Sequence, residues 1–183
     1  MELDATVEMG MVEQAQRGDR EAFCALVDQY RERVIDVVYR MCGDPALAED
    51  AAQITFLRAW QNLPRYQPRA AFRSWLYRIA VNAALDMLRR ERPTAPVDAL
   101  ELPSADPQPE AAYEEQERAR LVRRAVLALP ESSRAALVLR EYHGLSYKEI
   151  AEALDISMGT VMSRLNYART KLLESLSSYL EVA

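Results

Sequence analysis

Five of the chain's nine prolines fall between Pro93 and Pro109, in the segment PTAPVDALELPSADPQP. Each proline removes a backbone hydrogen-bond donor and biases the residue before it away from the helical conformation. A segment of this composition is typical of an extended, solvated linker. The sequence therefore predicts two folded units, residues 10–92 and 114–183, joined by a flexible proline-rich linker over residues 93–113.

Both units have the composition of helical proteins. Only five of the 183 residues are glycine, and Ala, Leu, Arg and Glu, which favour helices, are abundant. Gly43 and the pair Asp44-Pro45 are typical end and start signals of helices. Apolar residues recur at three- and four-residue steps in five segments that we expect to be helices: Glu21–Met41, Pro45–Leu63, Ala71–Glu91, Glu114–Leu129 and Glu131–Tyr142. The expected fold class is all-α, with two small helical domains.

The charge is unevenly distributed along the chain. The net charge of −5 argues at first against a nucleic-acid partner, but the distribution carries more information than the sum. Residues 1–57 hold twelve acidic and five basic side chains, whereas residues 58–92 hold eight arginines against Asp86 and Glu91. Residues 157–171 contain basic side chains and no acidic ones. Two basic segments on an acidic chain indicate two anion-facing surfaces.

Enzymatic and metal-binding functions have little support in the sequence. Cys24 and Cys42 are expected to be small buried side chains, and His143 is the only histidine. Phosphate-binding glycine loops and histidine-paired nucleophiles are missing, so we expect no enzymatic activity, no cofactor and no metal. The acidic N-terminus lacks the basic segment followed by an apolar segment that a signal peptide has. No stretch approaches the ~20 apolar residues of a membrane span. A cytoplasmic location is therefore expected.

Residues 145–173 hold the most specific pattern, two helices joined by a tight turn. Ser146 and Glu149 form a predicted capping box, and Ser157 is expected to cap the second helix. That helix begins with small polar residues and continues with basic ones, as in a helix-turn-helix whose second helix enters the major groove. A helical hairpin with a solvated charged face is the alternative. The candidate DNA-contacting residues face away from the apolar side: Ser157, Gly159, Thr160, Ser163, Arg164, Tyr167 and Arg169.

Residues 56–78 interleave six aromatic residues with five arginines. Aromatic rings stack on unpaired bases and arginines neutralise the backbone, so the pattern suits single-stranded nucleic acid. Most of the rings are expected in the core, because aromatic side chains dominate small helical cores. Tyr66 is the expected exception, since Pro64 and Pro68 place it in a loop.

Three segments resemble the extracytoplasmic-function sigma factors of bacterial RNA polymerase. AEDAAQITFLRAW (48–60) is similar to the family's helix that docks on the polymerase clamp. AAFRSWLYRIAVNAALDMLRRE (70–91) is similar to its −10 element helix, and LPESSRAALVLREYHGLSYKEIAEALDISMGTVMSRLNYARTKL (129–172) to its −35 domain. The resemblance implies a sigma-2-like helical bundle and a sigma-4-like helix-turn-helix domain, with transcription initiation as the function.

The same resemblance implies partners and site residues. It implies binding to core RNA polymerase, to duplex DNA at −35 through the helix-turn-helix residues above, to the melted −10 strand, and to an anti-sigma factor. The polymerase-facing or helix-holding positions are Asp50, Gln53, Phe56 and Arg58. The −10 positions are Arg65, Tyr66, Arg69, Arg73, Trp75, Arg78, Asn82 and Asp86. Family members commonly carry a basic residue where this chain has Met162, which puts one −35 contact in question.

A second function class remains open at this point. A conventional regulator with a helical sensor or dimerisation domain would also carry a C-terminal helix-turn-helix, and it would bind operators without polymerase. The basic, aromatic first domain discriminates between the two hypotheses, because a sensor domain has no need of it.

Overall fold

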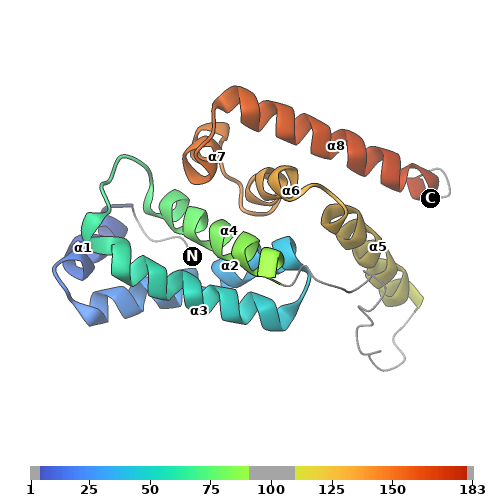
Figure 1. Cartoon of the computed structure of the whole chain (residues 1–183). Helices are drawn as coiled ribbons and strands as arrows, with labels where there is room; N and C mark the ends of the chain where they lie inside the picture. The colour runs from blue at the N-terminus through green and yellow to red at the C-terminus, as the bar shows by residue number, and fades with distance from the viewer. Residues whose placement is uncertain (1–4, 91–109, 181–183) are drawn as a thin grey trace.

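The computed structural model describes residues 5–90 and 110–180, and within these ranges all regular structure is helical, which confirms the predicted fold class. Figure 1 shows the first four α-helices grouped together and the last four lying along one side of them. The elements are α1 (Ala5–Gln16), α2 (Arg20–Cys42), α3 (Pro45–Asn62), η1 (Leu63–Arg65), α4 (Phe72–Arg90), α5 (Glu110–Leu127), α6 (Glu131–Leu137), η3 (Val138–Tyr142), α7 (Tyr147–Leu154) and α8 (Met158–Leu180). None of these described helices is long and apolar enough to cross a lipid bilayer.

The predicted linker, residues 93–113, falls mostly outside the described residues. Its last four positions belong to α5, which begins at Glu110, four residues before the predicted start. The segment α1 was not predicted at all. It contributes Val12 and Ala15 to the core, and its Gln16 side-chain amide donates to the carbonyl oxygens of Leu63 and Tyr66, at 3.0 and 2.8 Å.

The turn between α2 and α3 forms as its sequence predicts. Gly43 ends α2 in the left-handed conformation, with φ 79°, and its N–H donates to the Tyr39 carbonyl. The Asp44 side chain then accepts from the amides of Ala46 and Leu47, and Pro45 occupies the first turn of α3, where its missing N–H is not needed. These local interactions fix where α2 ends and where α3 begins.

The first four helices enclose an apolar core. Helix α2 packs against α1, α3 and α4, and α4 lies beside it as Figure 1 shows. The buried stripe along α2 consists of Ala22, Leu26, Tyr30, Val34, Val37, Val38 and Met41. Cys42 is half-buried and packs against this core. Cys24 is exposed, so the expectation that it is buried is wrong: it lies two residues from both Ala22 and Leu26, on the face of α2 opposite the apolar stripe.

The expected single helix Glu131–Tyr142 is divided in the structure. Helix α6 ends at Leu137, and η3 continues it as a wider π-helical segment to Tyr142. Such segments are rare and shift the residues that follow around the helix axis. The chain then turns through His143 and Gly144, and the Leu145 amide donates to the Leu139 carbonyl at 3.0 Å.

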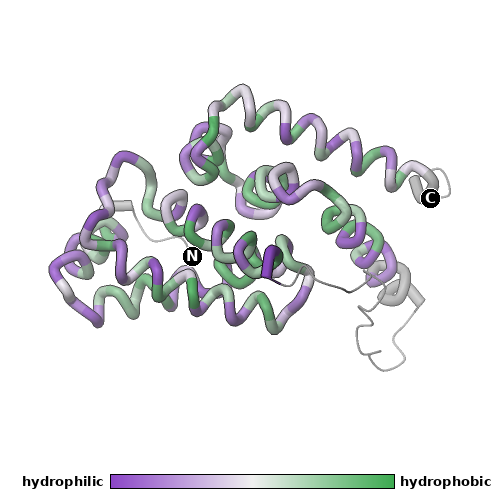
Figure 2. The backbone as a smooth tube through the Cα atoms, viewed as in Figure 1, coloured by the Kyte–Doolittle hydropathy of each residue, from purple (hydrophilic) through white to green (hydrophobic). Residues whose placement is uncertain are grey.

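The two halves share a continuous apolar core instead of standing apart. One cluster of buried residues runs from Val12 and Ala84 in the first half to Leu139, Ile150 and Leu165 in the second. Figure 2 shows hydrophobic segments on the facing sides of both halves. Helix α7 lies directly against α4, so the helix-turn-helix sits on the helix that carries the predicted −10 residues.

The glycine at the end of α2 gives a test of this packing. A Cβ atom at Gly43 would lie 2.6 Å from Cδ1 of Leu127, and the positive φ is itself strained for any other residue. We expect Gly43→Ala to lower the free energy of unfolding by about 2–4 kcal/mol, of which the left-handed conformation accounts for about 1–2. In a Leu127→Ala background the additional loss should fall to the backbone part. Urea denaturation measures both, and an equal loss in the two backgrounds would show that Leu127 is not the obstacle.

Candidate nucleic-acid interface

The helix-turn-helix has the geometry that its caps predict. The Ser146 hydroxyl accepts from the Glu149 amide at 3.3 Å, and Glu149 Oε2 accepts from the Ser146 amide at 2.9 Å, which completes the capping box. Asp155 ends α7 in the left-handed conformation with φ 56°. Ser157 then caps α8, its hydroxyl accepting from the Thr160 amide at 3.1 Å.

The first turns of α8 form an exposed polar surface. The hydroxyls of Ser157 and Thr160 form a hydrogen bond of 2.8 Å, and the Ser163 hydroxyl donates to the Thr160 carbonyl. Val161, Leu165 and Ala168 hold the opposite side of the helix in the core. The exposed members of the predicted set are Ser157, Gly159, Ser163, Tyr167 and Arg169, while Thr160 and Arg164 are half-buried.

Two side chains on α8 make the predicted DNA-binding surface less basic than its sequence pattern indicates. Arg169 donates to Glu141 of η3 at 2.8 Å, so its guanidinium is already held by a carboxylate. Met162 is 48% exposed and lies among the DNA-facing candidates. A thioether offers phosphate no charge, so the start of α8 carries less positive potential than a basic residue would give it.

The arginines of α4 are engaged by the second half of the chain. Arg73 donates through Nε to Glu149 Oε1 at 2.9 Å, and its Nη2 makes a second bond to the same oxygen. Arg78 donates to Asp155 Oδ2 at 2.9 Å. Asn82, one turn further along α4, is exposed. Two of the eight predicted −10 residues therefore bind the helix-turn-helix in this structure.

The prediction that Tyr66 stands outside the core is wrong. Its ring is 7% exposed and packs against Phe72 and Trp75, with centroid separations of 5.8 and 5.0 Å. Its hydroxyl donates to the Ala70 carbonyl at 2.8 Å, and burial raises its pKa to about 12. The prolines do place Tyr66 between helices, but the loop folds inwards because a large ring gains more from burial than from exposure.

The remaining −10 candidates fall into two groups. Arg65 and Arg69 are exposed at the loop that precedes α4. Trp75 is half-buried and packs against the core, and Asp86 is half-buried and accepts from Arg58 of α3 at 2.9 Å. The first group is accessible to a ligand, whereas the second joins parts of the first domain to one another.

The polymerase-facing candidates on α3 divide in the same way. Asp50 and Gln53 are exposed, and Leu57, one helical turn beyond Gln53, is 59% exposed. Phe56 packs against the core, and Arg58 holds Asp86. Positions three and four apart share one helix face, so Leu57 extends the exposed face of Asp50 and Gln53. Leu57 is not among the polymerase-facing residues predicted from the sequence.

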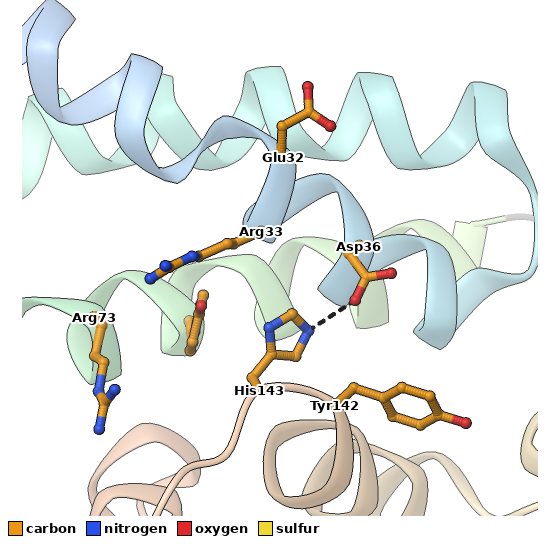
Figure 3. Close-up of a pocket in the computed structure, with 7 residues that line it drawn as sticks. Glu32, Arg33, Asp36, Arg73, Tyr142 and His143 are labelled. Atoms are coloured by element: carbon orange, nitrogen blue, oxygen red, sulfur yellow. Dashed lines mark ion pairs between the residues drawn. The ribbon is translucent and has the colours of Figure 1, made fainter. Parts of the chain in front are cut away.

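A polar cavity of about 490 Å³ lies where the two halves meet, lined by α2, α4 and the turn after η3. Figure 3 shows His143 reaching from the second half towards Asp36 on α2, with Nε2 3.2 Å from Asp36 Oδ2. Burial acts to raise the pKa of Asp36, but the contact with His143 and the hydrogen bond from Arg40 hold that pKa below its usual value. The guanidinium of Arg40 also lies 3.6 Å from the centre of the Tyr142 ring.

An apolar groove of about 420 Å³ runs along the C-terminal half of α8. Its lining is Leu137, Glu141, Arg169, Leu172, Leu173 and Leu176, and Leu173 is 64% exposed. The apolar stripe of α8 therefore continues past the core of the domain. Among the described residues, no group of three His, Cys, Asp or Glu side chains is placed to hold a metal ion.

The fold and this surface define an all-helical DNA-binding protein with a C-terminal helix-turn-helix, and comparison with known proteins narrows the class. Two family models match the chain, Sigma-70 region 2 over residues 26–94 and Sigma-70, region 4 over residues 119–172. The chain is 33% identical over 176 residues to the ECF RNA polymerase sigma factor SigW of Bacillus subtilis, an alignment that covers 90% of this chain and 94% of SigW. It is 38% identical over 172 residues to the ECF RNA polymerase sigma-E factor of Escherichia coli, covering 87% and 88%. The match to the ECF RNA polymerase sigma factor SigE of Mycolicibacterium smegmatis is 38% over 158 residues, but the chain spans only 61% of that relative.

Solved structures agree across both halves. CnrH, solved in complex with the cytosolic domain of CnrY, is 28% identical and superposes with a TM-score of 0.73 over 96% of this chain and 99% of CnrH. The sigma factor RpoE from Bartonella quintana, solved with the anti-sigma factor NepR, is 20% identical with a TM-score of 0.67 over 85% of this chain and 96% of RpoE, which supports the fold. The chain belongs to the extracytoplasmic-function sigma factors of RNA polymerase.

Proposed function

We propose that this chain binds core RNA polymerase and directs promoter-specific initiation. Residues 114–183 read duplex DNA at −35, and residues 10–92 bind polymerase and hold the melted −10 strand. The observation that carries the proposal is that one chain presents both a capped, exposed recognition helix, α8, and a second helix, α4, that carries Arg73, Arg78 and the exposed Asn82.

At −35, the exposed start of α8 supplies the base-facing groups. Ser157, Thr160 and Ser163 offer hydroxyls that donate or accept at base edges, and Gly159 allows close approach. Arg164, Tyr167 and Arg169 lie further along and suit phosphate contacts, which position the helix without carrying sequence information. Arg169 would exchange Glu141 for a phosphate, a replacement of one oxyanion by another.

At −10, Arg65, Arg69, Arg73, Arg78 and Asn82 contact the non-template strand. Arginine donors neutralise the backbone, and a base flipped out of the stack requires a preformed pocket because unstacking costs a few kcal/mol. The rings of Tyr66 and Trp75 form a packed wall behind the loop, and Asp86 fixes α4 through Arg58. These three act by holding the loop and helix in place.

The polymerase contact lies on α3, where Asp50, Gln53 and Leu57 share an exposed face, with Phe56 and Arg58 supporting it from behind. An anti-sigma factor holds the chain inactive: the sigma factor RpoE from Bartonella quintana, whose fold matches over both halves, was solved with the anti-sigma factor NepR. The function needs no catalytic chemistry, so we propose that the chain is not an enzyme and acts in the cytoplasm with polymerase.

In vitro transcription on genomic DNA of the source organism tests the proposal. With core polymerase, the chain should produce start sites that are absent without it and that share two upstream sequence elements. Arg78→Ala should reduce these transcripts at least tenfold while binding to core polymerase changes less than twofold, because the side chain lies on α4 and not on α3. If no start site depends on the chain, it does not direct initiation.

A regulator that binds operators independently of polymerase is the alternative function. It would bind its sites tightly as a purified protein, whereas an acidic chain with a net charge of −5 should bind free duplex weakly, because phosphate neutralisation supplies most non-specific affinity. Binding to promoter duplex by the free chain as tight as that of the holoenzyme, at equal salt, would favour the regulator.

The missing basic residue at Met162 gives a second prediction. Met162→Lys should strengthen binding to a mixed-sequence 30-base-pair duplex and steepen the slope of log K against log salt by about 1, the value for one added phosphate contact. Fluorescence anisotropy across a salt series measures the slope. Ser177→Lys adds the same charge at the far, exposed end of α8, and an equal change in both variants would place Met162 away from DNA.

A further inference from the structure

Exposed apolar side chains gather at the start of α8. Among the residues whose burial is described, eight large hydrophobic side chains are exposed, and three of them lie between positions 158 and 167: Met158, Met162 and Tyr167. The other five are distributed over α1, α3, α5, η3 and the far part of α8. Single exposed apolar residues are normal on a protein surface, whereas a group of them indicates a contact with a ligand or partner.

Met158 and Met162 form an apolar row along α8. They are four positions apart, so their side chains lie one above the other on the same face of the helix. Val161 and Leu165 are buried and fix the rotation of α8, which leaves each methionine 48% exposed. Both lie in the first two turns of the helix, where the recognition helix of a helix-turn-helix meets base edges.

A row of small residues runs beside the methionine row. Gly159 and Ser163 each follow a methionine by one position, which places them about 100° further around the helix. Gly159 lies open to solvent, because a Cβ atom there would have only the Ser157 hydroxyl within 4 Å, at 3.8 Å. The small row lets the backbone approach a ligand closely, and the longer methionine side chains then extend past it towards that ligand.

The surroundings of the methionine row indicate that it meets DNA. Residues 157–171 contain basic side chains and no acidic ones, which favours a polyanion, and the hydroxyls of Ser157 and Thr160 lie at the same end of α8. The apolar group that a base presents in the major groove is the C5-methyl group of thymine. An unbranched, flexible thioether can adapt its shape to such a small apolar group.

We propose that Met158 and Met162 read thymine in the −35 duplex by packing on its C5-methyl group. A basic residue at position 162 would instead favour guanine or a phosphate. Met162 therefore changes which base is read, besides removing a charge from the surface. This inference rests on the proposed function, because it takes α8 as the helix that reads −35 duplex.

Deoxyuridine tests the contact, since it pairs as thymidine does and lacks only the methyl group. Core polymerase carrying the full-length chain selects duplexes from a pool with a random −35 window, and core polymerase alone gives the background. Each enriched thymine is then replaced by deoxyuridine. The M158A/M162A variant, in which alanine favours the helix, is compared with V7A/V122A, which truncates two exposed apolar side chains on α1 and α5.

We expect the unmodified chain and V7A/V122A to enrich thymine in the window. Deoxyuridine should lower the affinity of both about threefold or more, the effect of losing one buried methyl group. M158A/M162A should enrich no thymine there and should bind both forms of the duplex equally. If the unmodified chain is insensitive to deoxyuridine, or if M158A/M162A is equally sensitive, the proposal is overturned and the methionine row faces a protein instead.

The same complexes separate this inference from the proposed function. Methyl-dependent binding that M158A/M162A abolishes, without any start site that depends on the chain, would support reading by α8 and contradict a role in initiation. Selection no different from that of core polymerase alone would overturn both, because the chain would then read no duplex sequence.

Discussion

Replacing Arg134 with alanine is expected to lower the free energy of unfolding by about 3 kcal/mol, the effect of removing a buried charged donor from three acceptors. The side chain is 8% exposed. It donates to the carbonyls of Met41, Leu127 and Leu129. The first two lie at the C-terminal ends of α2 and α5, where carbonyl groups have no partner within the helix and carry partial negative charge.

The geometry of the guanidinium is part of this expectation. Its planar fork reaches three carbonyls, one at the end of α2 and two at the end of α5 and the turn after it, whereas the ammonium of lysine is a compact donor that cannot span them. Arg134→Lys should therefore recover less than half of the lost stability. Arg124→Ala, at an exposed position of α5, is the control and should change stability by less than about 0.5 kcal/mol. Urea denaturation gives all three values, and a loss below 1 kcal/mol for Arg134→Ala would mean that water replaces the guanidinium at these carbonyls.

Phe72→Ala is expected to cost about 3–5 kcal/mol, the range for truncating a fully buried phenylalanine. The ring is 1% exposed. Tyr30, Tyr66 and Trp75 surround it, with centroid separations of 5.6, 5.8 and 5.5 Å. Tilted and edge-on ring pairs add about 0.5–1.5 kcal/mol each beyond the area they bury, so the cavity left by alanine removes several favourable contacts together.

The Phe72 substitution also has a functional consequence. Tyr66 and Trp75 would lose the ring that both of them pack against, and the loop 65–71 would lose its support. Phe72→Leu keeps most of the volume and should cost about 1–2 kcal/mol, while Leu57→Ala at a side chain 59% exposed should cost little. Thermal unfolding ranks the stability of the three variants. If Phe72→Ala loses no more stability than Leu57→Ala, Phe72 is not a core residue. In the Leu variant, promoter melting should fall more than binding to polymerase.

Several features of this protein were determined by the sequence over a few residues. The end of α2 at Gly43, the start of α3 at Asp44-Pro45 and the caps at Ser146 and Ser157 all depend on bonds within four positions. Such bonds form in any context that allows the helix, so a local pattern is sufficient to predict them. The family resemblance was visible for the same reason, because its motifs are contiguous.

Helix α1 was missed because its local signal is weak. Among the residues of this helix whose burial is described, 6–16, only Val12 and Ala15 are buried, and Gly10 lies in its middle. Its position is fixed by contacts made far away in sequence, such as the Gln16 bonds to Leu63 and Tyr66. Helices of this length depend on tertiary packing for most of their stability, so their own sequences need not carry a pattern that predicts a helix.

Only the tertiary structure decided how the site residues are used. The backbone of Tyr66 does lie in a loop between helices, as predicted, but its ring is buried in the core. The acids that meet Arg73 and Arg78 lie 76 and 77 residues away, across the proline-rich segment. A charge pattern records how many arginines a segment holds and says nothing of what faces them. The proline-rich segment therefore divided the chain in the sequence prediction, and the shared apolar core brought the two halves together, because burying their facing apolar surfaces is favourable.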